Sequence, residues 1–265
     1  MCIVFIAVDQ HRRYPLIIAA NRDEYHARPS EAMRYWPDQP GILAGRDGRA
    51  GGTWFGVNTR GRIAAVTNRR PAQPARTGAR SRGDLPVRFL RGSDTPEDYG
   101  EFLRTAHRDF SPFNLIYGEP GQLYCFASGE AAGRRLESGF HSISNGALDD
   151  PWPKMARGVR LLKERISGDR ALRSDDLAQM MKDATRAAGA DADAARFSSI
   201  FVTGARYGTR TTTLLFGARG RFDLYEYNYA AHGAESGRRH YSMRVHHAAN
   251  TTDSRPLKQS KPAGG

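Results

Sequence analysis

The chain begins with two short runs of apolar residues that have the pattern of neighbouring β-strands. Residues 2–8 and 15–20 are almost entirely apolar, and the polar segment 9–14 separates them. Unbroken apolar runs of this length, in place of strict alternation, indicate strands buried on both faces. A short polar connection lets two such strands pair as a hairpin. The start of the chain therefore favours a layered fold with a buried sheet.

The rest of the sequence shows strand patterns towards both ends and helix patterns between them. Helical spacing or a capping residue before Pro and an acid predicts helices over 94–107, 154–166 and 174–187. β-Branched and aromatic runs between turn residues predict further strands, over 53–57, 63–67, 113–117, 123–127, 197–204, 211–217 and 222–228. This order predicts one α+β layered domain over 1–249 and a disordered polar tail over 250–265.

Length and hydropathy limit the class of protein. A chain of 265 residues can bury a large core, and none of its apolar stretches reaches the roughly 20 residues that cross a bilayer. The first eight residues lack the basic region and the cleavage site of a secretory signal. We therefore expect a soluble, cytoplasmic protein.

The charge is strongly positive and comes almost wholly from arginine. Lys and Arg number 40 against 28 Asp and Glu, for a net charge of +12. The basic residues are spread along the chain, and the densest run, 69–91, carries no recognition-helix or RNA-binding pattern. We interpret that run as mostly a solvated basic loop. The balance favours a small anionic or amphipathic ligand, and no nucleic-acid partner is expected.

The cysteine count excludes two kinds of site. Cys2 and Cys125 are the only cysteines, too few for a disulfide framework or a four-cysteine metal centre. The histidines near the C-terminus lack the spacing of metal ligands. We predict neither a metal site nor a cofactor.

The position of Cys2 is unusual. Removal of Met1 would leave Cys2 with a free α-amine beside its thiol, and an amine that titrates near pH 8 can serve as the base for that thiol. The buried strand that begins at this residue would hold the nucleophile rigidly. The alternative interpretation is that Cys2 is a small buried hydrophobe, as most free cysteines are.

The second apolar run ends in four polar residues, Asn21-Arg-Asp-Glu24. If the two runs pair as a hairpin, this segment lies beside Cys2. Asp23 could then hold the α-amine, and Arg22 could stabilise a thiolate or bind a substrate carboxylate. The alternative is a charged turn with a local salt bridge.

Three further residues are candidates for a pocket. Trp54 follows Gly51 and Gly52 and could line a substrate site or belong to the core. Asn68 and Asn145 stand where strands are expected to end, so their amides could donate to an oxyanion or cap a turn.

Ten short motifs, taken together, resemble one known family. They occur in order along nearly all of the predicted domain: Met1-Cys-Ile, Asn21-Arg-Asp-Glu24, Arg28-Pro29, Gly52-Thr-Trp, Gly56-Val-Asn58, Val66-Thr-Asn68, Ser81-Arg-Gly83, Ser144-Asn-Gly146, Trp152-Pro-Lys154 and Tyr207-Gly-Thr-Arg210. The set is similar to the NRDE family, also called transport and Golgi organisation 2.

The resemblance implies a four-layer αββα sandwich of the N-terminal-nucleophile hydrolase type, similar to choloylglycine hydrolases. It implies Cys2 as nucleophile, Asp23 as partner of its amine, Asn68 and Asn145 as oxyanion or amine-positioning residues, and Arg210 as a nearby charge. Asn21, Arg22 and Trp54 would then bind substrate. In the related acylases an arginine precedes the aspartate by several residues. Arg22 is adjacent to Asp23, so on a continuing strand the two side chains should point to opposite faces.

Two functions remain open at this point. The first is an N-terminal-cysteine amidohydrolase that cleaves a non-peptide acyl–amide bond. The second is a carrier or trafficking protein that holds a hydrophobic anion, such as a lipid conjugate or haem, in the same pocket around an apolar cleft containing Trp54.

Overall fold

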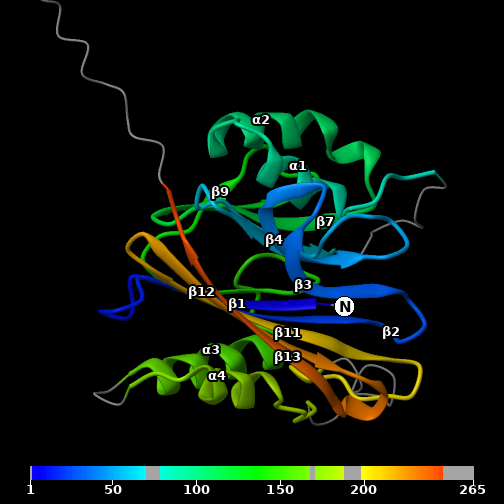
Figure 1. Ribbon diagram of the computed structural model, residues 1–265, viewed down its shortest axis with the longest axis vertical. Helices are drawn as coiled ribbons and strands as arrows, with labels where there is room; N and C mark the ends of the chain where they lie inside the picture. The colour runs from blue at the N-terminus through cyan, green and yellow to red at the C-terminus, as the bar shows by residue number, and fades with distance from the viewer. Residues whose placement is uncertain (1, 70–77, 168–170, 188–197, 247–265) are drawn as a thin grey trace, which may run out of the picture.

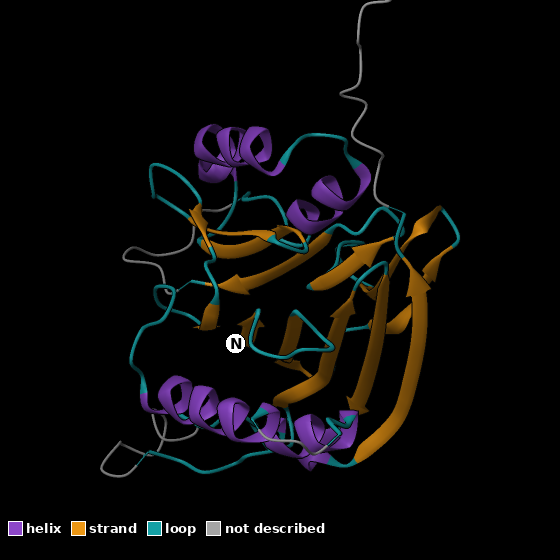
Figure 2. Ribbon diagram, turned by 90° about the vertical axis from the view of Figure 1, so that its left-hand side faces the viewer, coloured by secondary structure: helices purple, strands orange, loops and turns teal. Residues whose placement is uncertain are grey.

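The computed structural model describes residues 2–69, 78–167, 171–187 and 198–246. Two antiparallel sheets lie face to face, and a pair of helices covers the outer face of each sheet (Figures 1 and 2). This is the predicted αββα arrangement. The predicted tail, 250–265, lies outside the described residues.

The first sheet has six strands, and the hairpin at the start of the chain lies inside it. Its spatial order is β10 (Gly139–Ile143), β1 (Cys2–Val8), β2 (Leu16–Tyr25), β11 (Tyr207–Ala218), β12 (Arg221–Tyr229) and β13 (Glu235–Arg244). β1 pairs with β2 in antiparallel register, with Cys2 opposite Arg22 and Val8 opposite Leu16. The predicted hairpin is therefore confirmed.

The second sheet has seven strands in sequential order. They are β3 (Ser30–Trp36), β4 (Gln39–Asp47), β5 (Phe55–Asn58), β6 (Ile63–Asn68), β7 (Phe113–Glu119), β8 (Gln122–Ala127) and β9 (Arg134–Arg135). Each strand pairs with the next in the chain, as in a meander, and the pairing of β5 with β6 agrees with the two strands predicted there.

The helices form the two outer layers. Over the seven-stranded sheet lie α1 (Asp84–Arg91) and α2 (Pro96–Ala106); over the six-stranded sheet lie α3 (Pro153–Ile166) and α4 (Ser174–Met181). Short 3-10 turns follow at His107–Asp109 and Ala231–Gly233. Thr95 accepts a hydrogen bond from the Asp98 backbone and so caps α2, where the sequence predicted a helix start.

Alternation along β1 builds two different cores. Val4, Ile6 and Val8 pack between the two sheets, whereas Ile3 and Phe5 pack against α3 and α4. Both faces of this strand are covered, which explains its unbroken apolar sequence. The same alternation puts Cys2 on the face between the sheets.

Parts of the structure differ from the expectations drawn from the sequence. Within the run 69–91, which we expected to be mostly a loop, residues 84–91 form α1 and bury Leu85, Phe89 and Leu90 against the second sheet. The part of 197–204 that is described, 198–204, is not a strand. Its backbone groups form hydrogen bonds outside the sheets. The Ile200 carbonyl accepts from the Asn21 side chain, and the Phe201 N–H donates to the Asp183 backbone carbonyl.

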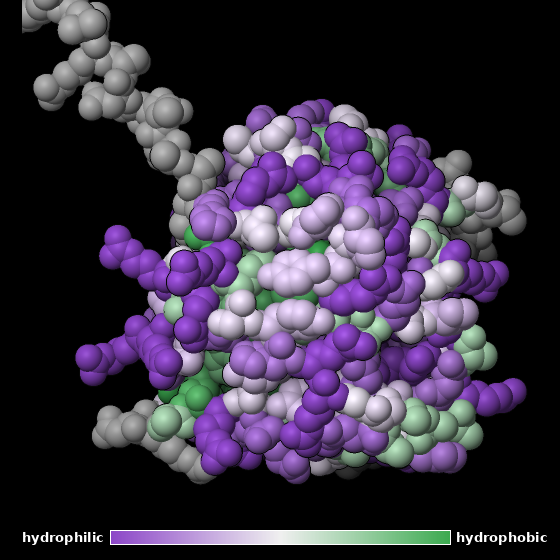
Figure 3. Space-filling model, in the orientation of Figure 1, coloured by the Kyte–Doolittle hydropathy of each residue, from purple (hydrophilic) through white to green (hydrophobic). Residues whose placement is uncertain are grey.

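Hydrophilic side chains predominate on the face in Figure 3, as expected when apolar side chains pack between layers. Across the described ranges, no helix has the length and apolarity that a membrane span needs.

Candidate active site

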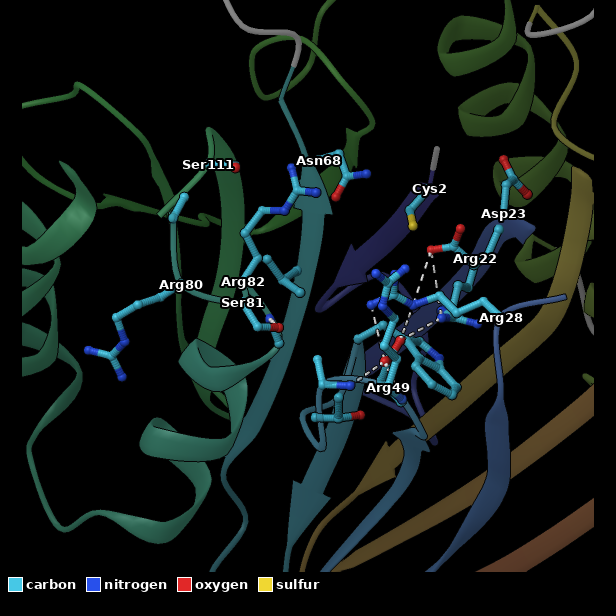
Figure 4. A pocket seen from close by; sticks show the side chains of 18 residues that line it. Cys2, Arg22, Asp23, Arg28, Arg49, Asn68, Arg80, Ser81, Arg82 and Ser111 are labelled. Carbon is cyan, nitrogen blue, oxygen red and sulfur yellow. Dashed lines mark hydrogen bonds and ion pairs between the residues drawn. The ribbon is translucent and has the colours of Figure 1, made fainter. Parts of the chain in front are cut away.

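A pocket of about 370 Å³ opens at the end of the sandwich where β1 begins. Cys2 lines it from the first position of β1, with its sulfur directed into the cavity (Figure 4). The side chain is half-buried, while the rest of β1 is buried. A rigid central strand thus presents one accessible thiol.

The second cysteine has a very different environment. Cys125 lies in β8 within the core between the sheets, and burial raises the pKa of its thiol to about 12. A thiol of that kind is almost wholly protonated at neutral pH and is a poor nucleophile. Cys2 is therefore the candidate for nucleophilic chemistry, and Cys125 is a structural residue.

Arg22 and Asp23 leave β2 on opposite faces, as the strand geometry predicts. Arg22 faces the second sheet, where it donates to the Asp47 carboxylate at 3.1 Å and stacks on Trp54 with 4.2 Å to the ring centroid. Asp23 accepts a hydrogen bond from the Thr209 hydroxyl of β11 at 2.7 Å. Both residues still line the pocket, because it wraps around the end of the strand.

Asp23 is a buried carboxyl beside the start of β1. Burial raises its pKa above the ordinary value, and the hydrogen bond from Thr209 and the positive charge of Lys154 partly oppose that rise. A carboxylate in such a place gains stability from a cationic neighbour. An ammonium group at the N-terminus of Cys2 would be such a neighbour.

The two asparagines meet at the same end of the sandwich. The Asn145 side-chain amide donates to the Asn68 carbonyl at 2.5 Å. The adjacent Ser144 hydroxyl donates to the Cys2 carbonyl at 2.8 Å. Asn68 lines the pocket, while Asn145 is buried and ties the end of β6 to the loop after β10.

Asn21 and Arg210, also predicted as site residues, do not line this pocket. Asn21 is buried under α4, where its amide donates to the Met181 and Ile200 carbonyls. Arg210 donates to three carbonyls of the turn after β2, those of Tyr25, His26 and Arg28. Their contacts are those of residues that hold the surrounding structure. The pocket does collect five of the predicted residues: Cys2, Arg22, Asp23, Trp54 and Asn68.

Sequence reasoning missed most of the charge in the pocket. Eight of its 18 lining residues are charged, which corrects the expectation of an apolar cleft; they are Arg22, Asp23, Glu24, Arg28, Asp47, Arg49, Arg80 and Arg82. Arg82 belongs to the motif Ser81-Arg-Gly83, a signal that was visible in the sequence without a role attached to it.

Asp47 organises part of this charge. Its carboxylate accepts from Arg22, from Arg28 at 2.6 and 3.1 Å, and from the backbone N–H groups of Arg49 and Ala50. Burial alone would raise the pKa of Asp47, but the hydrogen bonds from Arg28 and Ala50 outweigh it and hold the pKa below its usual value. One carboxylate therefore orients two of the arginines at the pocket.

Within the described part of the chain, no three His, Cys, Asp or Glu residues converge as metal ligands. The pocket brings together a half-buried thiol, a buried carboxyl group, an asparagine side chain and more basic than acidic residues. These are the components of acyl transfer through a covalent thioester.

Comparison with known proteins agrees with the fold and the motifs. The family model of Transport and Golgi organisation 2 matches residues 1–231. The mouse Transport and Golgi organization 2 homolog is 33% identical over 244 residues, covering 81% of this chain and 88% of the mouse protein. The human homolog is 32% identical over 243 residues with the same coverage.

Among solved structures, a mutant of conjugated bile acid hydrolase from Clostridium perfringens has a TM-score of 0.51, at 9% identity and with 92% of each chain covered. This likeness shows the fold and agrees with the predicted four-layer αββα sandwich. By the match of its sequence over most of its length, the chain belongs to the Transport and Golgi organisation 2 family.

Proposed function

We propose that this protein is a cysteine amidohydrolase that cleaves a non-peptide acyl–amide C–N bond with Cys2 after removal of Met1. The observation that carries the proposal is the half-buried Cys2 thiol at the first position of a central strand, in a pocket with Asp23 and Asn68. The surplus of arginine at the pocket favours an anionic or amphipathic small molecule as substrate.

The proposed reaction has two steps. The Cys2 sulfur attacks the amide carbonyl, and the thiol proton passes through the α-amine of Cys2 to the nitrogen of the leaving amine. The C–N bond then breaks and leaves an acyl thioester on the sulfur. Water attacks the thioester, so that one amide and one water become one carboxylic acid and one amine, with the thiol restored.

Asp23 and Asn68 have separate roles in this scheme. The Asp23 carboxylate would orient the α-amine and stabilise it when it carries the proton. The Asn68 side-chain amide would donate to the oxyanion that forms in each step. Asn145 supports the second role, because its amide already donates to the Asn68 carbonyl and so fixes the backbone there.

A carrier function for a hydrophobic anion remains the second candidate, and one observation favours it, although in a different pocket from the one that the sequence predicted. A separate pocket of about 370 Å³ lies where β1 ends, lined mainly by apolar core residues such as Leu16, Leu123 and Phe222, with Arg219 also at its wall. The charged Cys2 pocket is a poorer match for an apolar ligand.

The cytoplasmic location of the protein stays a prediction from the sequence.

The first test needs no knowledge of the substrate. Peptide mass spectrometry after brief, limiting iodoacetamide treatment at pH 7 reports whether Met1 is removed and how fast Cys2 reacts relative to Cys125. The proposal predicts complete removal of Met1 and much faster labelling of Cys2. A retained Met1, or labelling of Cys125 ahead of Cys2, would contradict it.

The second test is turnover on a panel of linear acyl amides with varied acyl chains and anionic amine groups. We expect Cys2→Ala to abolish hydrolysis and Cys125→Ala to retain it, provided that thermal unfolding shows both variants folded. Full turnover by Cys2→Ala would refute the hydrolase. Stoichiometric binding of a long-chain anion without product, unchanged in Cys2→Ala, would favour the carrier instead.

A further inference from the structure

Arg82 lies on the wall of the pocket across from Arg22. In Figure 4, Arg82 and Asn68 stand on one side of Cys2, and Arg22 and Asp23 stand on the other. We propose that the Arg82 guanidinium, rather than that of Arg22, supplies the positive charge that stabilises the Cys2 thiolate. This inference rests on the proposed function, in which Cys2 is the nucleophile.

The charges of Arg22 and Arg28 are already compensated. Arg22 donates to Asp47 at 3.1 Å and lies 3.8 Å from Glu24. Arg28 donates to the same Asp47 carboxylate at 2.6 Å and also lies 3.8 Å from Glu24. Two arginines and two carboxylates thus form a nearly neutral cluster, which exerts little net attraction on a thiolate.

The remaining arginines of the pocket are less suited than Arg82. Arg49 is exposed, so solvent screens its charge. Arg80 is exposed, lies 3.9 Å from the Asp84 carboxylate, and stacks on Phe110 at 5.0 Å from the ring centroid. Neither combines burial with a free charge.

Arg82 does combine them. It is half-buried, and among residues 2–69, 78–167, 171–187 and 198–246 it has no carboxylate within ion-pair distance. In those ranges the one hydrogen bond of its guanidinium goes to a neutral acceptor, the Pro112 carbonyl, at 3.1 Å. Burial lowers the pKa of the Arg82 guanidinium, and the negative charge of an ionised Cys2 is the largest influence that raises it again.

The other charged groups around Cys2 also affect the ionisation of its thiol. Asp23 is on the helix side of β2, where the hydrogen bond from Thr209 and the positive charge of Lys154 in α3 both favour its ionised form. Glu24 and Asp47 belong to the nearly neutral cluster with Arg22 and Arg28. The Asp23 carboxylate disfavours a thiolate and the α-ammonium of a processed Cys2 favours one, so Arg82 adds a side-chain cation to that of the N-terminus.

The backbone holds Arg82 in place. The Thr53 N–H donates to the Gly83 carbonyl at 3.2 Å, and a Cβ on Gly52 would come within 2.5 Å of the Gly83 backbone. This glycine contact brings the segment before α1 directly against the strand layer. The Leu85 N–H then donates to the Arg82 carbonyl as the chain turns into α1. The guanidinium is therefore presented from a rigid support.

The test is the pH dependence of Cys2 alkylation by iodoacetamide, followed by peptide mass spectrometry on the full chain. Arg82→Gln should move the midpoint of the rate profile upward by about one pH unit, which lowers the rate at pH 7 about tenfold. Arg82→Lys, which keeps the charge, should restore most of the rate. The α1 surface variant Arg88→Gln, which removes the same charge away from the pocket that holds Cys2, should change it less than threefold.

Each other outcome contradicts a different statement. A shift in Arg82→Gln no larger than that in Arg88→Gln would overturn the assignment. Equal shifts in Arg82→Gln and Arg82→Lys would also overturn it, because they would point to the lost Pro112 contact and not to charge. Thermal unfolding shows whether each variant is folded. If Arg82→Gln fails to fold, the labelling rate of Arg82→Lys tests the assignment. If wild-type Cys2 is itself inert, the proposed function fails, and this inference fails with it.

Discussion

Replacement of Asp47 by Asn tests whether this carboxylate organises the pocket. Asn has nearly the same shape but no charge. Its single oxygen can still accept from the backbone of Arg49 and Ala50, as one carboxylate oxygen does now. The oxygen that accepts from Arg22 and Arg28 becomes an NH₂ group that faces two guanidinium donors.

The structure gives a magnitude for this change. Arg22 is only 6% exposed, so it would be left nearly buried beside a donor group, whereas Arg28 is 29% exposed and keeps part of its solvation. Removing one partner of a buried ion pair costs about 3–5 kcal/mol. With Arg28 partly solvated, we expect the free energy of unfolding to fall by about 3 kcal/mol at pH 7, which corresponds to about 6–12 °C in Tm.

The contribution of Asp47 to the free energy of unfolding should depend on pH in one direction. Hydrogen bonds hold the pKa of folded Asp47 below its unfolded value of about 3.9, so its contribution is complete above that pH and is lost as the pH falls through the folded pKa. The difference between wild type and Asp47→Asn should therefore narrow below pH 4.

Urea unfolding at a series of pH values measures both effects. Asp38→Asn is the matched control, because Asp38 also forms a bidentate pair with an arginine, Arg46, but in an exposed position, where we expect a smaller change. A loss below 1 kcal/mol for Asp47→Asn at pH 7, or a difference that does not depend on pH, would refute the reasoning.

Three further predictions concern the surroundings of the site. Asn21→Ala should lower the free energy of unfolding by about 2–4 kcal/mol, since it leaves buried carbonyls without donors, while iodoacetamide labelling of Cys2 stays unchanged; loss of labelling in a folded variant would instead favour a substrate-binding role. Gly52→Ala should displace the segment at Gly83, measured as lower Tm and altered Cys2 labelling, and an unchanged Tm would show that the two backbones separate freely. His141 donates to Asp149, which raises its pKa, so its stabilising contribution is present below about pH 6.5 and is lost as the pH rises through the folded value; His141→Gln should remove this dependence from unfolding curves, and an identical dependence would contradict it.

Strong local patterns were enough to predict the central elements. The hairpin of β1 and β2 was predictable because its apolar runs are unbroken and the polar segment between them is short. The capped start of α2 was predictable because Thr95 and the proline after it favour a helix N-terminus. β3 and β13 escaped prediction because most of their residues are exposed or half-buried and many are polar, a composition that resembles a loop. β4 also escaped prediction, although residues 42–45 are buried.

The juxtaposition of Cys2 with residues 21–24 followed from the hairpin, since antiparallel pairing brings the start of one strand beside the end of the next. The separation of Arg22 from Asp23 followed from strand alternation. Asn21 was misjudged as a pocket residue, because the same alternation turns it under α4, a helix more than 150 residues further along the chain.

Local periodicity and contiguous motifs were sufficient to predict the layered fold, the family and the pairing of Cys2 with the polar end of β2. The charges that surround the thiol depend on how the layers pack. Asp47, Arg28 and Arg82 come from different segments, and whether an arginine is neutralised or free depends on a partner that is distant in the chain. Local sequence patterns contain no information on such pairing, so the net charge around the thiol could be assigned only from the packed structure.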